Sequence, residues 1–253
     1  MRSLNIEQLR EEIEKWIQQY VQSANANGIV VGLSGGIDSA VTASLAGEAI
    51  GKEHVIGVSL PCESPQKDIH DAKMVAETLG IEFLEINLKD TYTSFLETAE
   101  PIIESNRLSR ANIKPRLRMT MLYFIGQSKG TYLVAGTGNR TELALGYFTK
   151  YGDGGVDFEP IGALYKCEVE QLAKLLNVPK KIIERPPSAG LWKGQTDEEE
   201  IGILYETLDE IIFKMDYGLE LNDFDPKKVE KVRQMFNSSK HKRKMPPIFE
   251  IEE

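Results

Sequence analysis

The hexapeptide SGGIDS at residues 34–39 carries the clearest chemical signal in the sequence. Glycines allow backbone N–H groups to approach a phosphate closely, because no Cβ stands between them. The hydroxyls of Ser34 and Ser39 are additional hydrogen-bond donors, and the Asp38 carboxylate could hold a magnesium ion against phosphate oxygens. A helix that follows the loop would add the positive end of its dipole. The hexapeptide therefore predicts a phosphate-binding loop.

This loop differs from the Walker loop, because the sequence contains no G-x-x-x-x-G-K-[ST] and no lysine follows the glycines. A glycine turn that only caps a helix is the alternative interpretation. The apolar run at 29–33 predicts a strand before the loop, and residues 38–50 have a helical pattern after it. This context of strand, loop and helix favours a phosphate site over a simple turn.

SGGIDS resembles the SGGxDS loop of the ATP pyrophosphatases, a superfamily that includes NAD, GMP and asparagine synthetases. Two further stretches narrow the resemblance to the NAD synthetase family. Residues 136–166, GTGNRTELALGYFTKYGDGGVDFEPIGALYK, are similar to its GT-x-x-x-x-E, GFFTKYGDGG-x-D and TK segments. SSKHKRKMPP at 238–247 is similar to its HKR segment. These ordered matches extend from about residue 32 to residue 246, so they are far more specific than one loop.

The resemblance implies an ATP site and a metal site. Thr137 and Lys166 would contact ATP, and Glu142 would join Asp38 as a ligand of Mg²⁺. Asp38 and Lys166 would be the catalytic residues, with Lys166 neutralising charge that accumulates on the phosphates. Ser188, in PPSAGL, replaces a threonine of the family and retains the hydroxyl that a phosphate would contact. The full ATP-binding set implied is Gly32, Leu33, Ser34, Gly35, Gly36, Ile37, Asp38, Ser39, Thr137, Lys166 and Ser188.

The resemblance also implies a site for deamido-NAD, formed by Arg116, Lys150, Asp157, His241 and Lys242. Pro115 stands where the family usually has alanine, and proline is typical of a first helical turn. We therefore expect a helix to start at Pro115. Without the resemblance, Arg116 would be interpreted as a cation on a helix surface, and HKRK would be interpreted as a solvated basic run. In an acidic chain, however, a basic cluster offers a polyanionic dinucleotide a local binding place.

By this resemblance the chain is a ligase that forms NAD from deamido-NAD, ATP and ammonia, the final step of NAD biosynthesis. An NAD-adenylate would be the intermediate, with AMP and pyrophosphate released, because a carboxylate cannot expel oxide whereas an acyl adenylate can expel AMP. A different ATP pyrophosphatase, such as a tRNA-modifying or GMP-forming ligase, would share SGGIDS but lack TKYGDGG. A nucleotide-binding regulatory module would not need Asp38, Glu142 and Lys166 together.

Strand and helix patterns alternate along the segments that carry these residues. Apolar runs predict strands at 29–33, 55–60, 82–88 and 132–135, and helical periodicity predicts helices at 38–50, 67–79, 92–105 and 114–127. The repeated βαβ units predict an α/β fold with a doubly wound parallel sheet flanked by helices, Rossmann-like and, by the resemblance, adenine nucleotide alpha-hydrolase-like. Extra helices are expected at 9–21, 166–176 and from Asp197 through Ile212. Ligands should bind beyond the carboxyl ends of the strands.

Composition and charge restrict the remaining possibilities. The 253 residues carry a formal net charge of −9, which argues against a surface that attracts nucleic acid. Cys62 and Cys167 form no disulfide or zinc pattern, and the N-terminus resembles neither a signal peptide nor a membrane span. We therefore expect a cytoplasmic protein that has no membrane or nucleic acid partner. We also expect one domain over residues 1–253 without a glutaminase domain and, by the resemblance, a homodimer.

Overall fold

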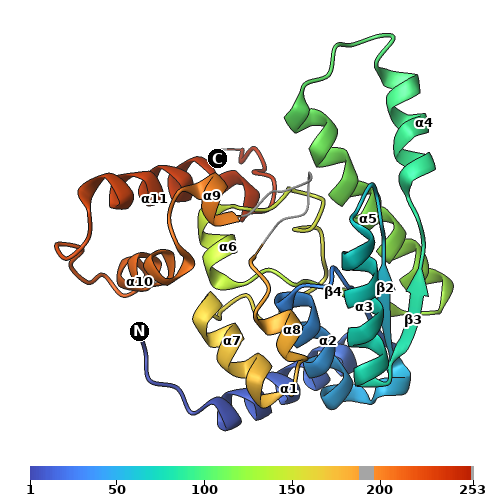
Figure 1. Cartoon of the computed structure of the whole chain (residues 1–253), viewed down its shortest axis with the longest axis horizontal. Coiled ribbons are helices and arrows are strands. Elements are labelled where there is room, and N and C mark those ends of the chain that lie inside the picture. The colour runs from blue at the N-terminus through green and yellow to red at the C-terminus, as the bar shows by residue number, and fades with distance from the viewer. Residues whose placement is uncertain (188–196, 252–253) are drawn as a thin grey trace.

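The computed structural model describes residues 1–187 and 197–251 and contains a four-stranded parallel sheet (Figure 1). The strands have the order β3-β2-β1-β4, so the chain adds β2 and β3 on one side of β1 and β4 on the other. They are β1 (Gly28–Gly32), β2 (Val55–Ser59), β3 (Glu82–Glu85) and β4 (Tyr132–Ala135). The predicted parallel sheet is confirmed, with strand ends within a few residues of those expected.

The central strand β1 is apolar without alternation because both faces of the sheet are covered. Ile29 and Val31 are buried on one side, in a core cluster with the helices that cover this face of the sheet. Val30 points to the other side and is buried in a second cluster with Tyr92 and Ile125. Successive side chains of a strand face opposite sides, so a doubly covered strand needs apolar residues at every position.

The first face of the sheet is covered by α2, which is buried along most of its length and packs against α1. Helix α1 places Ile13, Ile17 and Val21 on one face at helical spacing, which gives the predicted amphipathic helix a partner. The elements of this layer are α1 (Ile6–Ser23), α2 (Ile37–Ile50), η1 (Lys52–His54), α3 (Gln66–Leu79), α7 (Lys166–Leu175) and α8 (Lys180–Ile183).

The second face is covered by α4 (Lys89–Ala99) and α5 (Arg107–Ser128), which extend beyond the sheet as an arm (Figure 1). The expected helix start at Pro115 is wrong, because α5 begins at Arg107 and Pro115 lies inside it. Asn106 and Ser109 form a reciprocal cap that starts the helix earlier. Pro115 is buried inside the helix, where it cannot donate a backbone hydrogen bond.

A third cluster of helices follows the sheet and buries its own apolar core, away from the strands (Figure 1). The single helix expected between Asp197 and Ile212 is wrong, because Gly202 has a φ of +70° and ends the first of two helices. Glycine adopts this left-handed conformation without a Cβ clash. The elements here are α6 (Arg140–Leu145), α9 (Asp197–Ile201), α10 (Tyr205–Asp216), α11 (Pro226–Ser238) and η2 (Lys240–Lys242).

The position of β1 between β2 and β4 determines where a ligand fits. The first residues after β1 and after β4 border a crevice at the carboxyl edge of the strands. Open α/β sheets bind ligands at such a point, as expected from the sequence. Within the described residues, no helix is both long and apolar enough to cross a membrane.

Candidate active site

The SGGIDS loop connects β1 to α2 and forms a compact ring of polar groups. The hydroxyl oxygens of Ser34 and Ser39 are 3.1 Å apart, and the Gly36 N–H donates to Ser34 Oγ at 3.2 Å. Ser39 Oγ donates to the Gly36 carbonyl at 3.0 Å, which holds the loop against the first turn of α2. N–H groups, hydroxyls and a helix N-terminus converge here, as an anion requires.

Gly35 allows the loop to approach its neighbours closely. It has a φ of +76°, and an added Cβ would lie 2.7 Å from the Asp68 carbonyl oxygen and 3.0 Å from Asp71 Cβ. Any larger residue would therefore be strained in its backbone and would collide with α3. The first glycine of the motif is therefore required by the packing of the loop against α3, and it is not among the residues that line the cavity described below.

Asp38 lies in the first turn of α2 and is held by two partners that come from distant parts of the chain. The Asn139 amide donates to its Oδ1 at 3.0 Å, and the Lys166 ammonium donates to its Oδ2 at 2.5 Å. Asn139 is fully buried and is the N-cap of α6, so it also fixes the start of that helix. These contacts bring together the loops after β1 and β4, as predicted.

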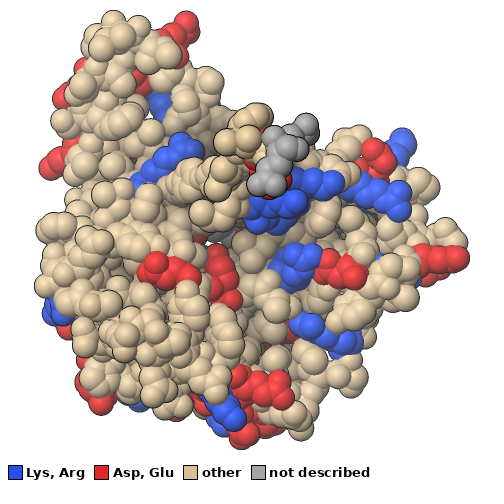
Figure 2. Space-filling view, turned by 180° about the vertical axis from the view of Figure 1, so that it is seen from behind, with Lys and Arg blue, Asp and Glu red and all other residues tan. Residues whose placement is uncertain are grey.

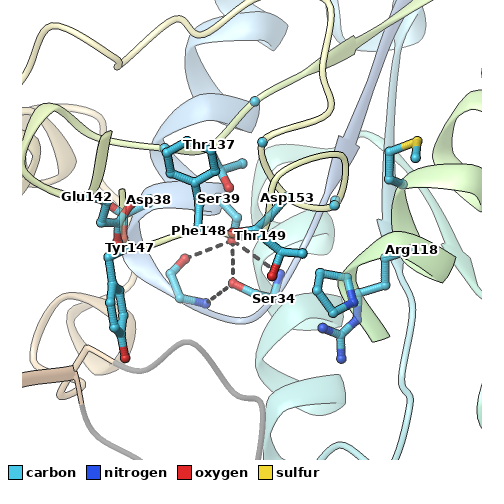
Figure 3. A pocket seen from close by; sticks show the side chains of 18 of the residues that line it. Ser34, Asp38, Ser39, Arg118, Thr137, Glu142, Tyr147, Phe148, Thr149 and Asp153 are labelled. Carbon is cyan, nitrogen blue, oxygen red and sulfur yellow. Dashed lines mark hydrogen bonds between the residues drawn. The ribbon is translucent and has the colours of Figure 1, made fainter. Parts of the chain in front are cut away.

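Glu142, in the first turn of α6, lies beside Asp38 on one side of the cavity (Figure 3). Its carboxylate accepts from the Asn139 N–H at 3.2 Å, and Asn139 Oδ1 accepts from the Glu142 N–H at 3.0 Å. Withdrawal from water, and then the nearby Asp38 carboxylate, raise the pKa of Glu142 well above its usual value. Two neighbouring carboxylates supply the oxygen ligands that suit Mg²⁺, which would take its remaining ligands from water and phosphate oxygens.

Lys166 begins α7 and is buried, with 4% of its surface exposed. Burial alone would lower its pKa, but the Asp38 and Glu142 carboxylates raise it above the usual value. Lys166 therefore stays charged inside the site. Its backbone is fixed by Asp209 of α10, which accepts from the Lys166 and Cys167 N–H groups at 3.3 and 2.8 Å.

These groups border one cavity of about 600 Å³ at the carboxyl ends of β1 and β4. A cavity of this size fits a nucleotide-sized ligand. Figure 3 shows the Ser34 and Ser39 hydroxyls between the acidic pair on one side and Arg118 on the other. The predicted residues that line it are Gly32, Leu33, Ser34, Gly36, Ile37, Asp38, Ser39, Thr137, Glu142, Lys166 and Lys242. Ser188 lies outside the described residues.

The residues predicted for deamido-NAD are divided between two places. Lys242 lines the cavity, where its ammonium donates to the Gly146 and Phe148 carbonyls at 2.7 Å. Arg116, Lys150 and His241 form a basic group outside the residues that line the described cavity. Arg116 donates to the Lys150 carbonyl at 3.3 Å, and Lys150 donates to the His241 carbonyl at 2.7 Å. Figure 2 shows several Lys and Arg side chains gathered on one face despite the acidic net charge.

Asp157 also lies outside the residues that line the described cavity, and its carboxylate is used within the fold. Its Oδ2 accepts from the Val134 N–H at 2.7 Å and its Oδ1 accepts from the Tyr123 hydroxyl at 3.0 Å. Its N–H donates back to the Val134 carbonyl at 2.9 Å. Asp157 therefore fastens the TKYGDGG loop to strand β4.

Several polar residues of the cavity were not singled out from the sequence. Arg118 donates to the Leu60 carbonyl at 3.0 Å, and burial lowers its pKa. Pro115, Arg118, Met119 and Leu122 all line the cavity and follow helical spacing. That spacing identifies Arg118, and not Arg116, as the arginine of α5 that faces the cavity.

Two acidic residues of the TKYGDGG region also line the cavity. Asp153 accepts from the Thr149 N–H at 2.9 Å within its own loop. Glu159 accepts from the Gly138 N–H at 3.2 Å, and burial raises its pKa to about 8. Their position in one glycine-rich loop was visible in the sequence, but their approach to the cavity depends on how that loop folds.

Comparison with known proteins assigns the chain to a family. The model of the family described as NAD synthase matches residues 9–246. A protein of Archaeoglobus fulgidus named NH(3)-dependent NAD(+) synthetase is 48% identical over 250 residues, which cover 98% of each chain. The chain belongs to the NAD synthase family. The resemblance inferred from SGGIDS, TKYGDGG and HKR is thereby confirmed.

A further relative and two solved structures are also similar to this chain. A Carboxydothermus hydrogenoformans protein, also named NH(3)-dependent NAD(+) synthetase, is 46% identical and covers 97% of this chain and 98% of its own. The structure described as NMN synthetase from Francisella tularensis is 36% identical, with a TM-score of 0.90, over 98% of this chain and all of its own. The NH3-dependent NAD synthetase from Campylobacter jejuni, solved with a nitrate ion, is 31% identical, with a TM-score of 0.84 and the same coverage.

Proposed function

We propose that this chain is an ammonia-dependent NAD synthetase, which converts the nicotinic acid carboxylate of deamido-NAD into the carboxamide of NAD. The observation that carries the proposal is the convergence of Asp38, Glu142 and Lys166 beside the Ser34 and Ser39 hydroxyls in one cavity. Relatives that match nearly the whole chain bear the name of this enzyme.

The first step would activate the substrate carboxylate with ATP. A carboxylate oxygen attacks the α-phosphorus, the bond to the β-phosphate oxygen breaks, and an acyl adenylate and pyrophosphate result. The SGGIDS hydroxyls and N–H groups would hold the departing pyrophosphate. Lys166 fits this step because its raised pKa keeps it cationic while charge accumulates on the phosphates.

Asp38 and Glu142 would hold Mg²⁺ together with phosphate oxygens. The donor set fits, because two carboxylates from separate helices meet and the mutual repulsion contributes to the raised pKa of Glu142. A divalent cation would remove that repulsion and would supply Lewis-acid stabilisation of the phosphate charge. Thr137, which lines the cavity, and Ser188 would add further contacts to ATP.

The second step would join nitrogen to the activated acyl group. Ammonia attacks the acyl carbon, the bond to the AMP oxygen breaks, and the nitrogen loses a proton as the amide forms. Lys242 would contact the dinucleotide from inside the cavity, and the basic group of Arg116, Lys150 and His241 would bind a part that extends outside it. We propose that Asp157 contributes to the deamido-NAD site indirectly, because it attaches the loop that carries Lys150 to strand β4.

A shorter substrate is the competing proposal. The Francisella tularensis structure is described as an NMN synthetase, and its likeness to this chain makes nicotinic acid mononucleotide a second acceptor to consider. The same carboxylate activation and amidation would then yield NMN. The basic group outside the cavity favours the dinucleotide, because a mononucleotide that filled the cavity would have no second phosphate to place there.

The remaining features follow from the proposed reaction and the sequence. Free ammonia would be the nitrogen donor, in keeping with the names of the relatives that match nearly the whole chain. We further propose a homodimer that works in the cytoplasm, at the last step of NAD biosynthesis.

The decisive experiment combines the chain with Mg-ATP and ammonium chloride and offers deamido-NAD or nicotinic acid mononucleotide in separate reactions. Equal yields of NAD, AMP and pyrophosphate are expected with deamido-NAD, and a parallel reaction with glutamine tests the nitrogen source. Asp38→Asn should abolish turnover, whereas Asp223→Asn, which changes an exposed partner of Lys214, should not.

Amide formed only from the mononucleotide would make the chain an NMN synthetase. AMP without either amide would indicate another ATP pyrophosphatase, and no ATP turnover a regulatory module.

A further inference from the structure

Arg185 lies directly after α8, and its guanidinium reaches the outer side of the phosphate loop. Its Nη1 donates to the Gly35 carbonyl at 3.2 Å, and its Nη2 donates to Asp68 Oδ1 at 2.6 Å. The Arg185 side chain is 20% exposed and also borders the cavity. A side chain that contacts both the loop and a carboxylate of α3 is suited to hold the loop in place.

The guanidinium is itself fixed by carboxylates one turn apart on α3. Asp71 is fully buried, and its Oδ1 accepts from the Lys181 ammonium at 2.5 Å. Its Oδ2 has no hydrogen bond within the described residues, but it lies 3.7 Å from Arg185 Nη1. Two cations of the α8 segment therefore face two carboxylates of α3, which leaves Arg185 little freedom to leave the loop.

The contact with Gly35 determines the direction of the next N–H group. A peptide unit is planar and trans, so its C=O and the following N–H point in opposite directions. Because Arg185 holds the Gly35 carbonyl on the outer side, the Gly36 N–H points inward to Ser34 Oγ, where it donates at 3.2 Å. Two consecutive glycines allow this peptide to rotate at little steric cost. Without the anchor, a carbonyl oxygen could turn toward the phosphates and repel them.

We propose that Arg185 is a positioning residue of the phosphate loop, which fixes the Gly35–Gly36 peptide so that its N–H faces the phosphates. Asp68 and Asp71 orient the guanidinium for this task. The inference rests on the proposed function, because the anion that benefits is the triphosphate of ATP and then the released pyrophosphate. The alternative is that Arg185 binds the phosphates directly from its place on the cavity wall.

The two roles predict opposite results for Asp68→Asn. If Arg185 positions the loop, loss of its carboxylate partner loosens the guanidinium, and both Arg185→Gln and Asp68→Asn weaken ATP binding. If Arg185 binds phosphate directly, Asp68→Asn releases the guanidinium from a competing anion and strengthens ATP binding. The double variant should be no worse than Arg185→Gln alone in the first case, because both changes disturb one anchor.

The test measures Mg-ATP and pyrophosphate binding by calorimetry, together with KM for each substrate and kcat. For Arg185→Gln we expect the ATP dissociation constant and KM to rise about tenfold, which corresponds to about 1.4 kcal/mol. KM for the nicotinate substrate should change little, whereas the melting temperature should fall, because Asp68 and the buried Asp71 lose a cationic partner. Arg185→Lys should recover part of the loss, because it retains the charge without the fork. Lys180→Gln is the matched control, since Lys180 lies on α8 in an exposed pair with Glu184.

Unchanged ATP and pyrophosphate binding in Arg185→Gln would overturn the proposal, as would tighter binding in Asp68→Asn. Because binding is measured without the nicotinate substrate, these outcomes do not depend on amide formation. A wild-type chain that binds Mg-ATP but forms no NAD would refute the proposed reaction while the positioning role is still decided by the variants.

Discussion

The Lys166 ammonium at the start of α7 lies 2.5 Å from the Asp38 carboxylate in the first turn of α2. The pair joins two helix N-termini that are far apart in the sequence, and Glu142 approaches the same point from α6. Opposite charges in a buried place interact strongly because little water screens them. Lys166 therefore partly balances the two carboxylates before any metal or phosphate arrives.

Lys166→Gln should lower kcat by about a hundredfold or more, because a cation aimed at developing phosphate charge is worth roughly 3 kcal/mol. The variant should also be less stable than the wild type in EDTA, since two carboxylates lose their neutralising partner. Adding Mg²⁺ should raise its melting temperature more than that of the wild type. Steady-state rates and thermal unfolding with and without Mg²⁺ check both parts, and a wild-type kcat would contradict the assigned role.

Asp209 links three helices that form the site. It accepts from the Thr141 hydroxyl of α6 at 2.5 Å and from two N–H groups at the start of α7, while lying on α10 itself. Asp209→Asn should reduce the free energy of unfolding by about 1–3 kcal/mol, because the NH2 group of asparagine would face N–H or O–H donors from which the aspartate oxygen accepts. We also expect a lower kcat, since Lys166 loses its backbone anchor.

Asp223→Asn provides the control for this prediction. The substitution is chemically the same, but Asp223 is 80% exposed and pairs with Lys214 at the surface. Such a pair contributes little to stability because water screens it, so urea unfolding of this variant should match that of the wild type. Equal losses of stability in the two variants would contradict the linking role of Asp209.

The phosphate loop could be predicted from the sequence because its geometry is local. Residues 34–39 lie between a short apolar strand and a helix, and the glycines need no distant partner to mark the turn. The parallel sheet was predictable for a similar reason, since alternating strands and helices allow few topologies. The family motifs added Glu142 and Lys166, which the structure brings to Asp38.

The remaining parts depend on contacts that the local sequence does not determine. Arg118 lines the cavity and Arg116 does not, because the rotation of α5 is set by the packing of its apolar face, which includes Ile125, against the sheet. Asp209 reaches α7 only because the C-terminal helices pack against it. From the sequence alone, Arg185 is indistinguishable from an ordinary surface cation, because its contacts with α3 and the phosphate loop depend on the fold.

Glu159 should make stability depend on pH. Its pKa is about 8 in the folded protein, because of burial, and close to 4.5 in the unfolded chain. Between these values the folded state binds one more proton than the unfolded state, so this residue's contribution to stability falls as pH rises, by about 1.4 kcal/mol per pH unit. Glu159→Gln stays neutral and should escape this loss.

Urea unfolding of the wild type and Glu159→Gln at pH 5.5 and pH 7.5 tests the expectation. The free energy of unfolding of the variant, relative to the wild type, should increase by about 2 kcal/mol between the two pH values. Comparing the two proteins removes the contribution of other acidic groups. A difference that is the same at both pH values would show that Glu159 is ionised in the folded protein.

Gly35 and Gly218 together separate backbone strain from close packing. Both have a positive φ, +76° and +65°, so alanine costs about 1 kcal/mol of conformational energy at either position. An added Cβ at Gly218 meets nothing within 4 Å, whereas at Gly35 it would lie 2.7 Å from the Asp68 carbonyl oxygen. Gly35→Ala should therefore lose about 1–3 kcal/mol more stability than Gly218→Ala.

Gly35→Ala should also weaken ATP binding, because relief of the clash moves the phosphate loop away from α3. Gly218→Ala should bind ATP as the wild type does. Urea unfolding and calorimetry on the two variants measure these differences, and similar behaviour of both would mean that the loop tolerates displacement from α3.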